Sequence, residues 1–513
     1  MKHLIGIDVG TSGVKTILVN ELGDLLATAF EDYPLSTPHP NWAEQDPADW
    51  WRATINTTRD VVSAADVDAA SICGVALSGQ MHSSVMLDDQ NEVLRPSMLW
   101  CDTRTTEQCR WITDTVGEDQ LSRWVSNPAL EGFTAPKLIW VRDHEPDVFA
   151  RIRRVMLPKD YVRFRMTGKY GMEVSDAAGT LLFDVQNRCW STDMIGALGL
   201  SEEIMPPVFE SIDICGEITD SVAEVTGLRA GTPVVAGGAD NTCGAVGTGI
   251  VSPGLVLASL GTSGVVFAHT DDVKVDPEMR VHSFCHSVPG KWYLMGVSLF
   301  AGGSLQWFRN NLGQLETVTG SLSGLDPYEL LTREAEQAPA GSEGLVFLPY
   351  LMGERTPHKD ANAKGAFVGI TGRHERSHMV RAVMEGITFA LRDSLEIMHG
   401  LGLEVEQIRT TGGGARSKLW RQIQADVYGA EVVTVNKEEG PAFGAAVLAG
   451  VGTGLYPGVE AACEELIKIE TRTEPNSSDQ ARYEDQYGIF TGLYPALKPS
   501  FDSISEIVKN DTR

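Results

Sequence analysis

Two hydrophobic patterns alternate along the chain. Short apolar runs predict buried strands, and stretches with apolar residues every three or four positions predict amphipathic helices. The strand-like runs are Gly74–Leu77, Pro233–Ala236, Trp292–Val297, Leu345–Leu348 and Gln407–Thr411. The helical stretches are Pro47–Ala64, His378–Met398 and Ser417–Tyr428, and a final helix-like segment follows the polar stretch after Thr471. This alternation predicts α/β domains with mainly parallel sheets.

One pentapeptide, Gly-Thr-Ser-Gly-Val, occurs twice, beginning at Gly10 and at Gly261, each time after a strand-like apolar run. The copies are 261 − 10 = 251 positions apart, about half of the 513 residues. A spacing this long indicates a duplicated α/β unit and not a solenoid repeat. We therefore expect two domains of related design, residues 1–247 and 248–513, with the junction in the glycine-rich tract Gly237–Gly254.

Composition narrows the class of protein. Hydrophobic residues make up 42% and charged residues 22%, which is ordinary for a globular chain. The net charge of −27 argues against nucleic-acid partners and anionic membranes, which both need a basic surface. The eight cysteines form no Cys-x-x-Cys pair, which is typical of reduced thiols. With neither a signal peptide nor an apolar run long enough to span a membrane, a cytoplasmic protein is expected.

The first copy of the pentapeptide has the residues of a phosphate-binding turn. Gly10, Thr11 and Ser12 follow a strand and would offer backbone N–H groups and two hydroxyls to an anion, with Lys15 close by. Asp8, at the end of the strand, could orient Mg²⁺ through water. For this turn alone, an ordinary β-hairpin turn is the better interpretation, since neither a Walker motif nor a dinucleotide fingerprint is present.

The second copy favours the phosphate-binding interpretation. Gly261, Thr262 and Ser263 would face the first turn across a cleft, so that a polyphosphate is held from both sides. Asp8 aligns with Ser259, so the turn itself does not need the acid. A role peculiar to the first turn, such as metal binding, is the hypothesis that follows.

Asp240 follows the strand-like run Pro233–Ala236 near the domain junction. A carboxylate there is well placed as the general base of a phosphoryl transfer. Asp is also a common helix cap, and the local sequence leaves the two interpretations evenly matched.

A glycine tract, Gly412–Gly414, lies between a predicted strand and a predicted helix. Consecutive glycines let the backbone approach a flat ligand such as adenosine, although a flexible connection is slightly favoured when the tract is read alone.

Polar residues also gather after two apolar runs in the first half of the chain. Gln80 and His82 follow one run, and Trp100, Asp102 and Arg104 follow the other. Together they could read the hydroxyl groups of a sugar, while Trp100 covers its apolar face. A lone histidine is more often structural, so the cluster carries this prediction and not His82 by itself.

These sites, in this order, resemble the FGGY carbohydrate kinases. Two long segments carry the resemblance, which covers essentially the whole chain: Gly132–His144, and Gly365–Ile370 continuing through His378–Gly386. Both segments can also be explained as core packing, and neither is expected to take part in catalysis. The resemblance implies two ribonuclease-H/actin-like α/β domains with a catalytic cleft between them, and phosphoryl transfer from Mg²⁺·ATP to a sugar.

The resemblance also implies roles for single residues. Asp240 matches the proton acceptor, which also contacts the sugar, and Asp8 matches the acid associated with Mg²⁺. Met81 and His82 match sugar contacts, beside Gln80. The residues that match the nucleotide site are Gly10, Thr11, Ser12, Lys15, Gly261, Thr262, Ser263, Gly302, Gln306, Gly413 and Ser417.

Within the family, Ser78–His82, Leu99–Arg104, Leu157–Tyr161 and Ser175–Thr180 resemble the subgroup that phosphorylates D-xylulose to D-xylulose 5-phosphate. Ser83 and Thr103 depart from that subgroup, where glycine is common at both positions. Kinases of ribulose, a deoxyketose, gluconate or glycerol are the alternatives, followed by a non-kinase ATPase of the actin fold. The partner is a small sugar, and assembly into a homodimer is left open.

Overall fold

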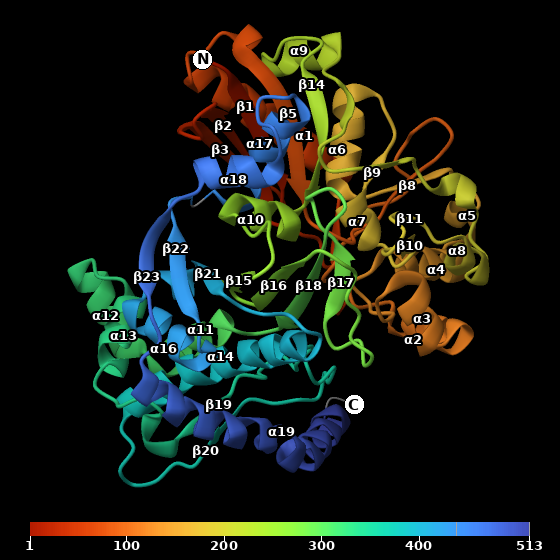
Figure 1. Cartoon of the computed structure of the whole chain (residues 1–513). Coiled ribbons are helices and arrows are strands. Elements are labelled where there is room, and N and C mark those ends of the chain that lie inside the picture. The colour runs from red at the N-terminus through yellow and green to blue at the C-terminus, as the bar shows by residue number, and fades with distance from the viewer. Residues whose placement is uncertain (438, 512–513) are drawn as a thin grey trace.

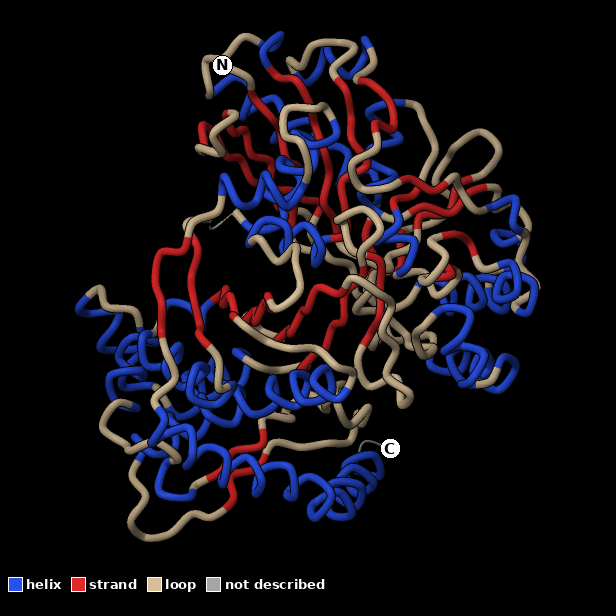
Figure 2. The backbone as a smooth tube through the Cα atoms, viewed as in Figure 1, coloured by secondary structure: helices blue, strands red, loops and turns tan. Residues whose placement is uncertain are grey.

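The computed structural model describes residues 1–437 and 439–511. Two large β-sheets, each covered by helices, lie one above the other in Figure 1, and their strands are red in Figure 2. The first sheet has the order β13 (Ile214–Glu217), β14 (Pro233–Ala239), β5 (Ile72–Gly79), β1 (His3–Val9), β2 (Gly13–Asn20), β3 (Leu25–Asp32). The second has the order β17 (His282–Cys285), β18 (Trp292–Ser298), β16 (Gly264–Thr270), β15 (Leu255–Leu260), β21 (Gln407–Gly412), β22 (Glu431–Val435), β23 (Ile469–Thr473).

Helices surround both sheets. Those of the first half are α1 (Pro47–Ala64), α2 (Thr106–Val116), α3 (Glu118–Val125), α4 (Thr134–His144), α5 (Pro146–Phe149), α6 (Pro158–Thr167), α7 (Val174–Ala178), α8 (Thr192–Ala197), α9 (Asp220–Thr226) and α10 (Asp240–Thr248). Those of the second half are α11 (Gly302–Leu312), α12 (Gln314–Ser323), α13 (Pro327–Ala335), α14 (Arg376–Gly400), α15 (Gly413–Arg416), α16 (Lys418–Tyr428), α17 (Gly440–Gly452), α18 (Val459–Leu466) and α19 (Ser477–Asp511). Five short strand pairs complete the described structure: β4 (Glu44–Gln45) with β7 (Ser97–Met98), β6 (Val85–Leu87) with β8 (Arg154–Met156), β9 (Met172–Glu173) with β12 (Val208–Phe209), β10 (Phe183–Asp184) with β11 (Cys189–Trp190), and β19 (Val346–Leu348) with β20 (Ala366–Val368).

The two sheets share a five-stranded core and differ at their edges, because β13 precedes β14 in the chain, β23 follows β22, and β17 is an additional edge strand of the second sheet. In the first, β1, β2 and β3 form an antiparallel meander, β5 and then β14 add in parallel beside β1, and β13 closes the edge antiparallel. In the second, β15, β16 and β18 form the meander, β21 and β22 add in parallel, and β23 closes the edge. The internal repeat seen in the sequence is thus a repeated βββαβαβ-type unit.

The prediction of mainly parallel sheets is wrong, because each sheet has only two parallel strand pairings. The reason lies in the loops. Residues 10–12 alone connect β1 to β2, and a connection this short can only join antiparallel strands. The strand and helix assignments themselves hold: α1 begins and ends at the predicted residues, α14 includes His378–Met398, and Ser417 is the N-cap of α16.

Helix α17 belongs to the second half of the chain but packs on the first sheet, against β1 and β5, and against α10 (Figure 1). Backbones approach very closely there. A Cβ atom added to Gly6 of β1 would lie 1.9 Å from the carbonyl oxygen of Ala442, and one added to Gly444 would lie 1.8 Å from that of Cys243. Only glycine fits at these positions, and α17 thereby joins the two halves.

In the part of the chain that the structure describes, no helix is both long and apolar enough to cross a membrane. All eight cysteines are free thiols, and five of them are buried.

We expect Gly6→Ala to destabilise the protein by roughly 1–3 kcal/mol, because the added methyl group forces β1 and α17 apart. Thermal unfolding followed by circular dichroism measures this as a lower melting temperature. Gly488→Ala is the control: Gly488 lies in α19 with open space around its Cα, so alanine there should raise helix stability slightly. Equal melting temperatures for the two variants would contradict the close packing.

Candidate active site

Both copies of the pentapeptide form β-hairpin turns at the same end of equivalent strands. Gly10–Ser12 connects β1 to β2, and Gly261–Ser263 connects β15 to β16. The Gly10 N–H donates to the carbonyl oxygen of Gly13 at 3.1 Å. Each turn is thus a β-hairpin turn that also carries hydroxyl side chains. The interpretation as an ordinary hairpin turn therefore does not exclude anion binding.

Side chains from neighbouring segments hold the first turn. Gln80, directly after β5, donates from Nε2 to the carbonyl oxygen of Gly10 at 3.3 Å. Gln45 donates to the carbonyl oxygen of Thr11 at 2.7 Å, and its own amide oxygen accepts from Gln80 at 3.2 Å. Gln80 is buried, and these hydrogen bonds tie its side chain to the turn. Gln45 had no recognisable signal in the sequence, because it acts only through this contact across the sheet.

The second turn lies against two other glycine-rich segments. The N–H groups of Gly302 and Gly303, at the start of α11, donate to the carbonyl oxygens of Gly261 and Thr262, both at 3.0 Å. A Cβ added to Gly412 would lie 2.4 Å from the carbonyl oxygen of Leu260. Three segments far apart in sequence therefore meet at Gly261, as a shared nucleotide site would require.

Two carboxylates lie at the ends of strands in the first domain. Asp8 is in β1, and Asp240 is the first residue of α10, directly after β14. Burial raises the pKa of Asp240 to about 7, with a further rise from the negative charge of Asp8, while the Asn241 N–H opposes it. Burial also raises the pKa of Asp8 to about 6, opposed by the nearby Ser78 hydroxyl and by the positive charge of Lys15. The N-cap of α10 is Ala239, so Asp240 is not the helix cap that its sequence also allowed.

A hard cation fits beside Asp8. Its Oδ1 atom is buried and accepts no hydrogen bond from any residue that the structure describes. Over the same residues, no group of three His, Cys, Asp or Glu side chains is arranged to hold a metal. A site with one carboxylate suits Mg²⁺, which keeps much of its water shell and takes its other ligands from substrate phosphates.

A cavity of about 720 Å³ connects the two halves of the chain. Its lining includes Asp240 and Asn241 from the first half, and Gly412, Gly413 and Arg416 from the second half. This volume is in the range of pockets that bind nucleotides and other small ligands. Its further lining residues in the described structure are Gly244, Thr248, Leu257, Ser259, Val265, Thr410, Thr411, Ala415, Arg421, Thr434, Val435, Lys437, Gly440, Pro441, Glu470 and Thr471.

Of the predicted nucleotide residues, Gly413 alone lines this cavity in the described structure. Gln306 is exposed, one turn into α11, and the Ser417 hydroxyl accepts from the Trp420 N–H at 3.1 Å and so caps α16. Lys15 forms an ion pair with Glu439, the residue before α17. That pair neutralises the lysine and ties the first turn's strand to the second half of the chain.

Met81 contacts Asn241, and neither Met81 nor His82 lines this cavity. The Asn241 amide lies 3.2 Å from Asp240 Oδ1 and 3.6 Å from Met81 Sδ. His82 Nδ1 is 2.6 Å from the carbonyl oxygen of Gly179, and because a carbonyl only accepts, Nδ1 carries the proton. Burial lowers the pKa of His82 to about 3, so the ring is neutral and Nε2 is an acceptor. Asn241, adjacent to Asp240, was missed from the sequence.

Asp102 is fully buried and lies in a different setting from the one predicted. Its two oxygens accept from Arg104 at 2.6 to 3.0 Å and from the Ala43 N–H at 2.7 Å. These hydrogen bonds give the carboxylate a structural role, and its predicted contact with the sugar stays a prediction. Trp100 remains exposed, and its indole N–H donates to the Thr11 hydroxyl at 2.9 Å, so it lies over the first turn.

A buried ionic cluster lies behind Asp240. Lys159 Nζ is 3.2 Å from Asp160, 3.6 Å from Glu173 and 3.1 Å from Asp176, and all four side chains are fully buried. These residues lie in or next to Leu157–Tyr161 and Ser175–Thr180, the segments that resemble the D-xylulose subgroup. The sequence contained the residues but gave no sign that they pair.

The cluster connects to the strand that carries Asp240. The Ser175 hydroxyl donates to Glu173 at 2.6 Å and accepts from the Ala239 N–H at 2.9 Å. Ala239 directly precedes Asp240, so the buried charges fix the backbone from which the proposed base projects.

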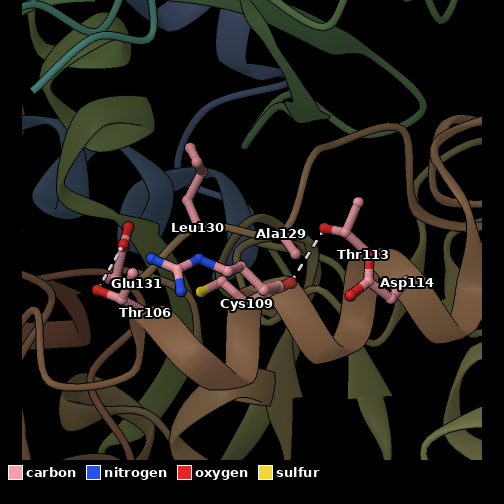
Figure 3. A pocket seen from close by; sticks show the side chains of 8 residues that line it. Thr106, Cys109, Thr113, Asp114, Ala129, Leu130 and Glu131 are labelled. Carbon is pink, nitrogen blue, oxygen red and sulfur yellow. Dashed lines mark hydrogen bonds between the residues drawn. The ribbon is translucent and has the colours of Figure 1, made fainter.

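A second hollow, of about 330 Å³, lies beside α2 (Figure 3). At one side of it the Thr106 hydroxyl donates to the Glu131 carboxylate at 3.0 Å. Its other lining residues are Cys109, Arg110, Thr113, Asp114, Ala129 and Leu130. None of the predicted site residues lines it, so it is separate from the candidate active site.

Comparison with known families covers most of the chain. Residues 3–247 match the N-terminal domain, and residues 256–453 the C-terminal domain, of the FGGY family of carbohydrate kinases.

Individual proteins are similar over nearly their full length. The chain is 42% identical to the xylulose kinase of Bacillus subtilis (strain 168), covering 99% of this chain and 100% of that one. It is 41% identical to the xylulose kinase of Escherichia coli (strain K12), covering 96% and 99%. The structure of a ligand-bound xylulose kinase from Lactobacillus acidophilus superposes with a TM-score of 0.91 at 27% identity, covering 98% and 100%.

We expect the His82 ring to stay neutral, with its proton on Nδ1, from about pH 5 to about pH 8, because its lowered pKa lies below that range. Nitrogen NMR of protein labelled at histidine measures this, with the His82 signal assigned by its loss in His82→Asn. An imidazolium signal that forms between pH 7 and pH 5 would contradict the assignment.

Proposed function

Because the chain belongs to the FGGY family of carbohydrate kinases, we propose that it phosphorylates D-xylulose with ATP, giving D-xylulose 5-phosphate and ADP. It is a carbohydrate kinase of two α/β domains with the actin-like ATPase fold. The observation that carries the proposal is the place of Asp240: it lines a cavity large enough for a nucleotide, and its neighbour Asn241 contacts Met81. Phosphoryl donor and sugar can therefore meet at one carboxylate.

In the proposed reaction, Asp240 accepts the proton of the C5 hydroxyl of the sugar. The hydroxyl oxygen attacks the γ-phosphorus in line, and the bond from that phosphorus to the ADP oxygen breaks. A pKa of about 7 makes Asp240 basic enough to take a proton near neutral pH while still being ionised in a useful fraction of molecules. The His82 Nε2 acceptor and Met81 would lie against the sugar.

The phosphates would lie between the two hairpin turns. Backbone N–H groups of Gly10–Gly13 and Gly261–Gly264 suit phosphate oxygens, and the hydroxyls of Thr11, Ser12, Thr262 and Ser263 add donors. The adenosine would lie at the Gly413 end of the cavity, beyond the start of α11. Gly302, Gln306 and Ser417 are proposed to contact or shape this end.

Asp8 would hold Mg²⁺, through water or directly, with the orphaned Oδ1 atom as its ligand. Bound there, the ion neutralises charge that develops on the transferring phosphoryl group. Asp8 itself lies close enough to Asp240 to raise its pKa, so the cation would also bring Asp240 closer to its ordinary acidity. A cytoplasmic location and assembly into a homodimer stay predictions.

The substrate is tested first by ADP release with Mg²⁺·ATP, without sugar and with D-xylulose, L-xylulose, D- and L-ribulose, gluconate and glycerol. Strong stimulation by D-xylulose and little by the others is the expected result. Stimulation by a different sugar would support the kinase activity but refute D-xylulose as the substrate. Equal rates with and without every sugar would point to the non-kinase ATPase.

We expect Asp240→Asn to lower kcat by roughly 10²- to 10⁴-fold, the usual contribution of a general base, with little change in the KM for ATP. Initial rates of ADP release measure both constants. Asp220→Asn is the matched control, since Asp220 is likewise the first residue of a helix, α9, at the opposite end of the first domain (Figure 1). Wild-type turnover in Asp240→Asn would refute the base assignment.

A further inference from the structure

His82 has an unusual backbone conformation. Its φ angle is +66°, in the left-handed region that non-glycine residues seldom adopt. It follows β5 by three residues, where the chain turns toward β6. A conformation of this kind persists only where surrounding contacts hold it, so the contacts of His82 show what fixes the ring.

Two buried side chains at the start of α4 hold the His82 carbonyl group. The Thr134 hydroxyl donates to the His82 carbonyl oxygen at 2.9 Å, and Lys137 Nζ donates to the same oxygen at 3.1 Å. Lys137 also donates to the carbonyl oxygen of Gly132. Thr134 and Lys137 have no exposed surface, and in the described structure Lys137 forms no ion pair. The ammonium group is thus committed to backbone oxygens.

The His82 imidazole also packs against the residue before α4 and against Gly179. The Phe133 ring packs edge-on against it, with centroids 4.8 Å apart, and Gly179 accepts from Nδ1. A Cβ added to Gly179 would lie 2.9 Å from Nδ1 and 3.0 Å from the methyl carbon of Met81. The Ala135 N–H donates to the carbonyl oxygen of Thr180 at 2.9 Å, which ties the start of α4 to the segment carrying Gly179.

We propose that Thr134 and Lys137 are positioning residues for sugar recognition: they hold the His82 backbone so that Gly179 fixes the ring and leaves Nε2 to the sugar. The segment Gly132–His144, which the sequence analysis interpreted as packing, thereby influences substrate binding through His82. This inference rests on the proposed function, since it takes the sugar to be the ligand of Nε2.

The arrangement does not depend on the charge of the lysine. Burial lowers the pKa of Lys137 to about 7, opposed mainly by the charge of Asp102. A neutral amine keeps two N–H groups, and two carbonyl oxygens accept from it.

The test compares Thr134→Val, which removes the hydroxyl at nearly constant volume, with Thr134→Ser, which keeps it. We expect Thr134→Val to raise the KM for D-xylulose roughly 3- to 10-fold, the effect of one hydrogen bond, with the KM for ATP and kcat within about two-fold of wild type. Thr134→Ser should behave as wild type. Lys137→Met and Gly179→Ala should also raise the sugar KM, and Gly196→Ala, with open space around its Cα, is the control for the glycine.

A second readout needs no substrate. In the sugar-free protein, nitrogen NMR of labelled histidine should show the Nδ1–H form of His82 in wild type and Thr134→Ser, and a mixture of the two neutral forms in Thr134→Val. Thermal melting checks that each variant is folded. The readout is therefore informative even if Lys137→Met does not fold.

Three results would overturn the proposal. They are an unchanged sugar KM and His82 signal in Thr134→Val, a serine variant as impaired as the valine one, or KM values for ATP and sugar that rise together. If wild type phosphorylates a different sugar, the same variants should raise the KM for that sugar. If it phosphorylates none, the proposed function fails, while the His82 signal still decides whether Thr134 positions the ring.

Discussion

The close contact of α17 with α10 and β1 is the constraint on which the rest of the structure depends. Gly6, Gly444 and Gly247 all face carbonyl oxygens so closely that a Cβ atom would lie 1.8 to 2.3 Å away. Backbone-to-backbone packing of this kind fixes distance and angle more tightly than interlocking side chains do. Because α10 begins with Asp240, the contact also fixes the proposed base relative to both sheets, and the ionic cluster around Lys159 fixes it from the other side.

Burial is the common physical cause behind the chemistry proposed for the site. It raises the pKa of Asp240 and of Asp8, keeps His82 neutral, and leaves an oxygen of Asp8 without a donor. Each of these effects would vanish in open water. The site therefore depends on groups that bind no ligand but exclude solvent, among them the α4 segment around Thr134.

Sequence reasoning succeeded where the information was local. The repeated pentapeptide predicted both turns, and the family, the two-domain fold and the reaction are confirmed by the comparisons. It could not show which partners the side chains would take: that the Asp102 carboxylate accepts from Arg104 and from the distant Ala43 N–H, or that Lys159 pairs with Asp176. The antiparallel pairing of β1 with β2 was missed, although the short connection between these strands allows only antiparallel pairing. The roles of the site residues stay predictions.

The place of α17 has a consequence for recombination within the family. A chimera that joins residues 1–247 of one member to the remainder of another has its crossover in the last turn of α10. Its weak point lies elsewhere, because α17 of one parent must then pack against β1, β5 and α10 of the other. Whether two parents are compatible thus depends on a contact nearly two hundred residues beyond the crossover. The small residues of one parent must match α17 of the other.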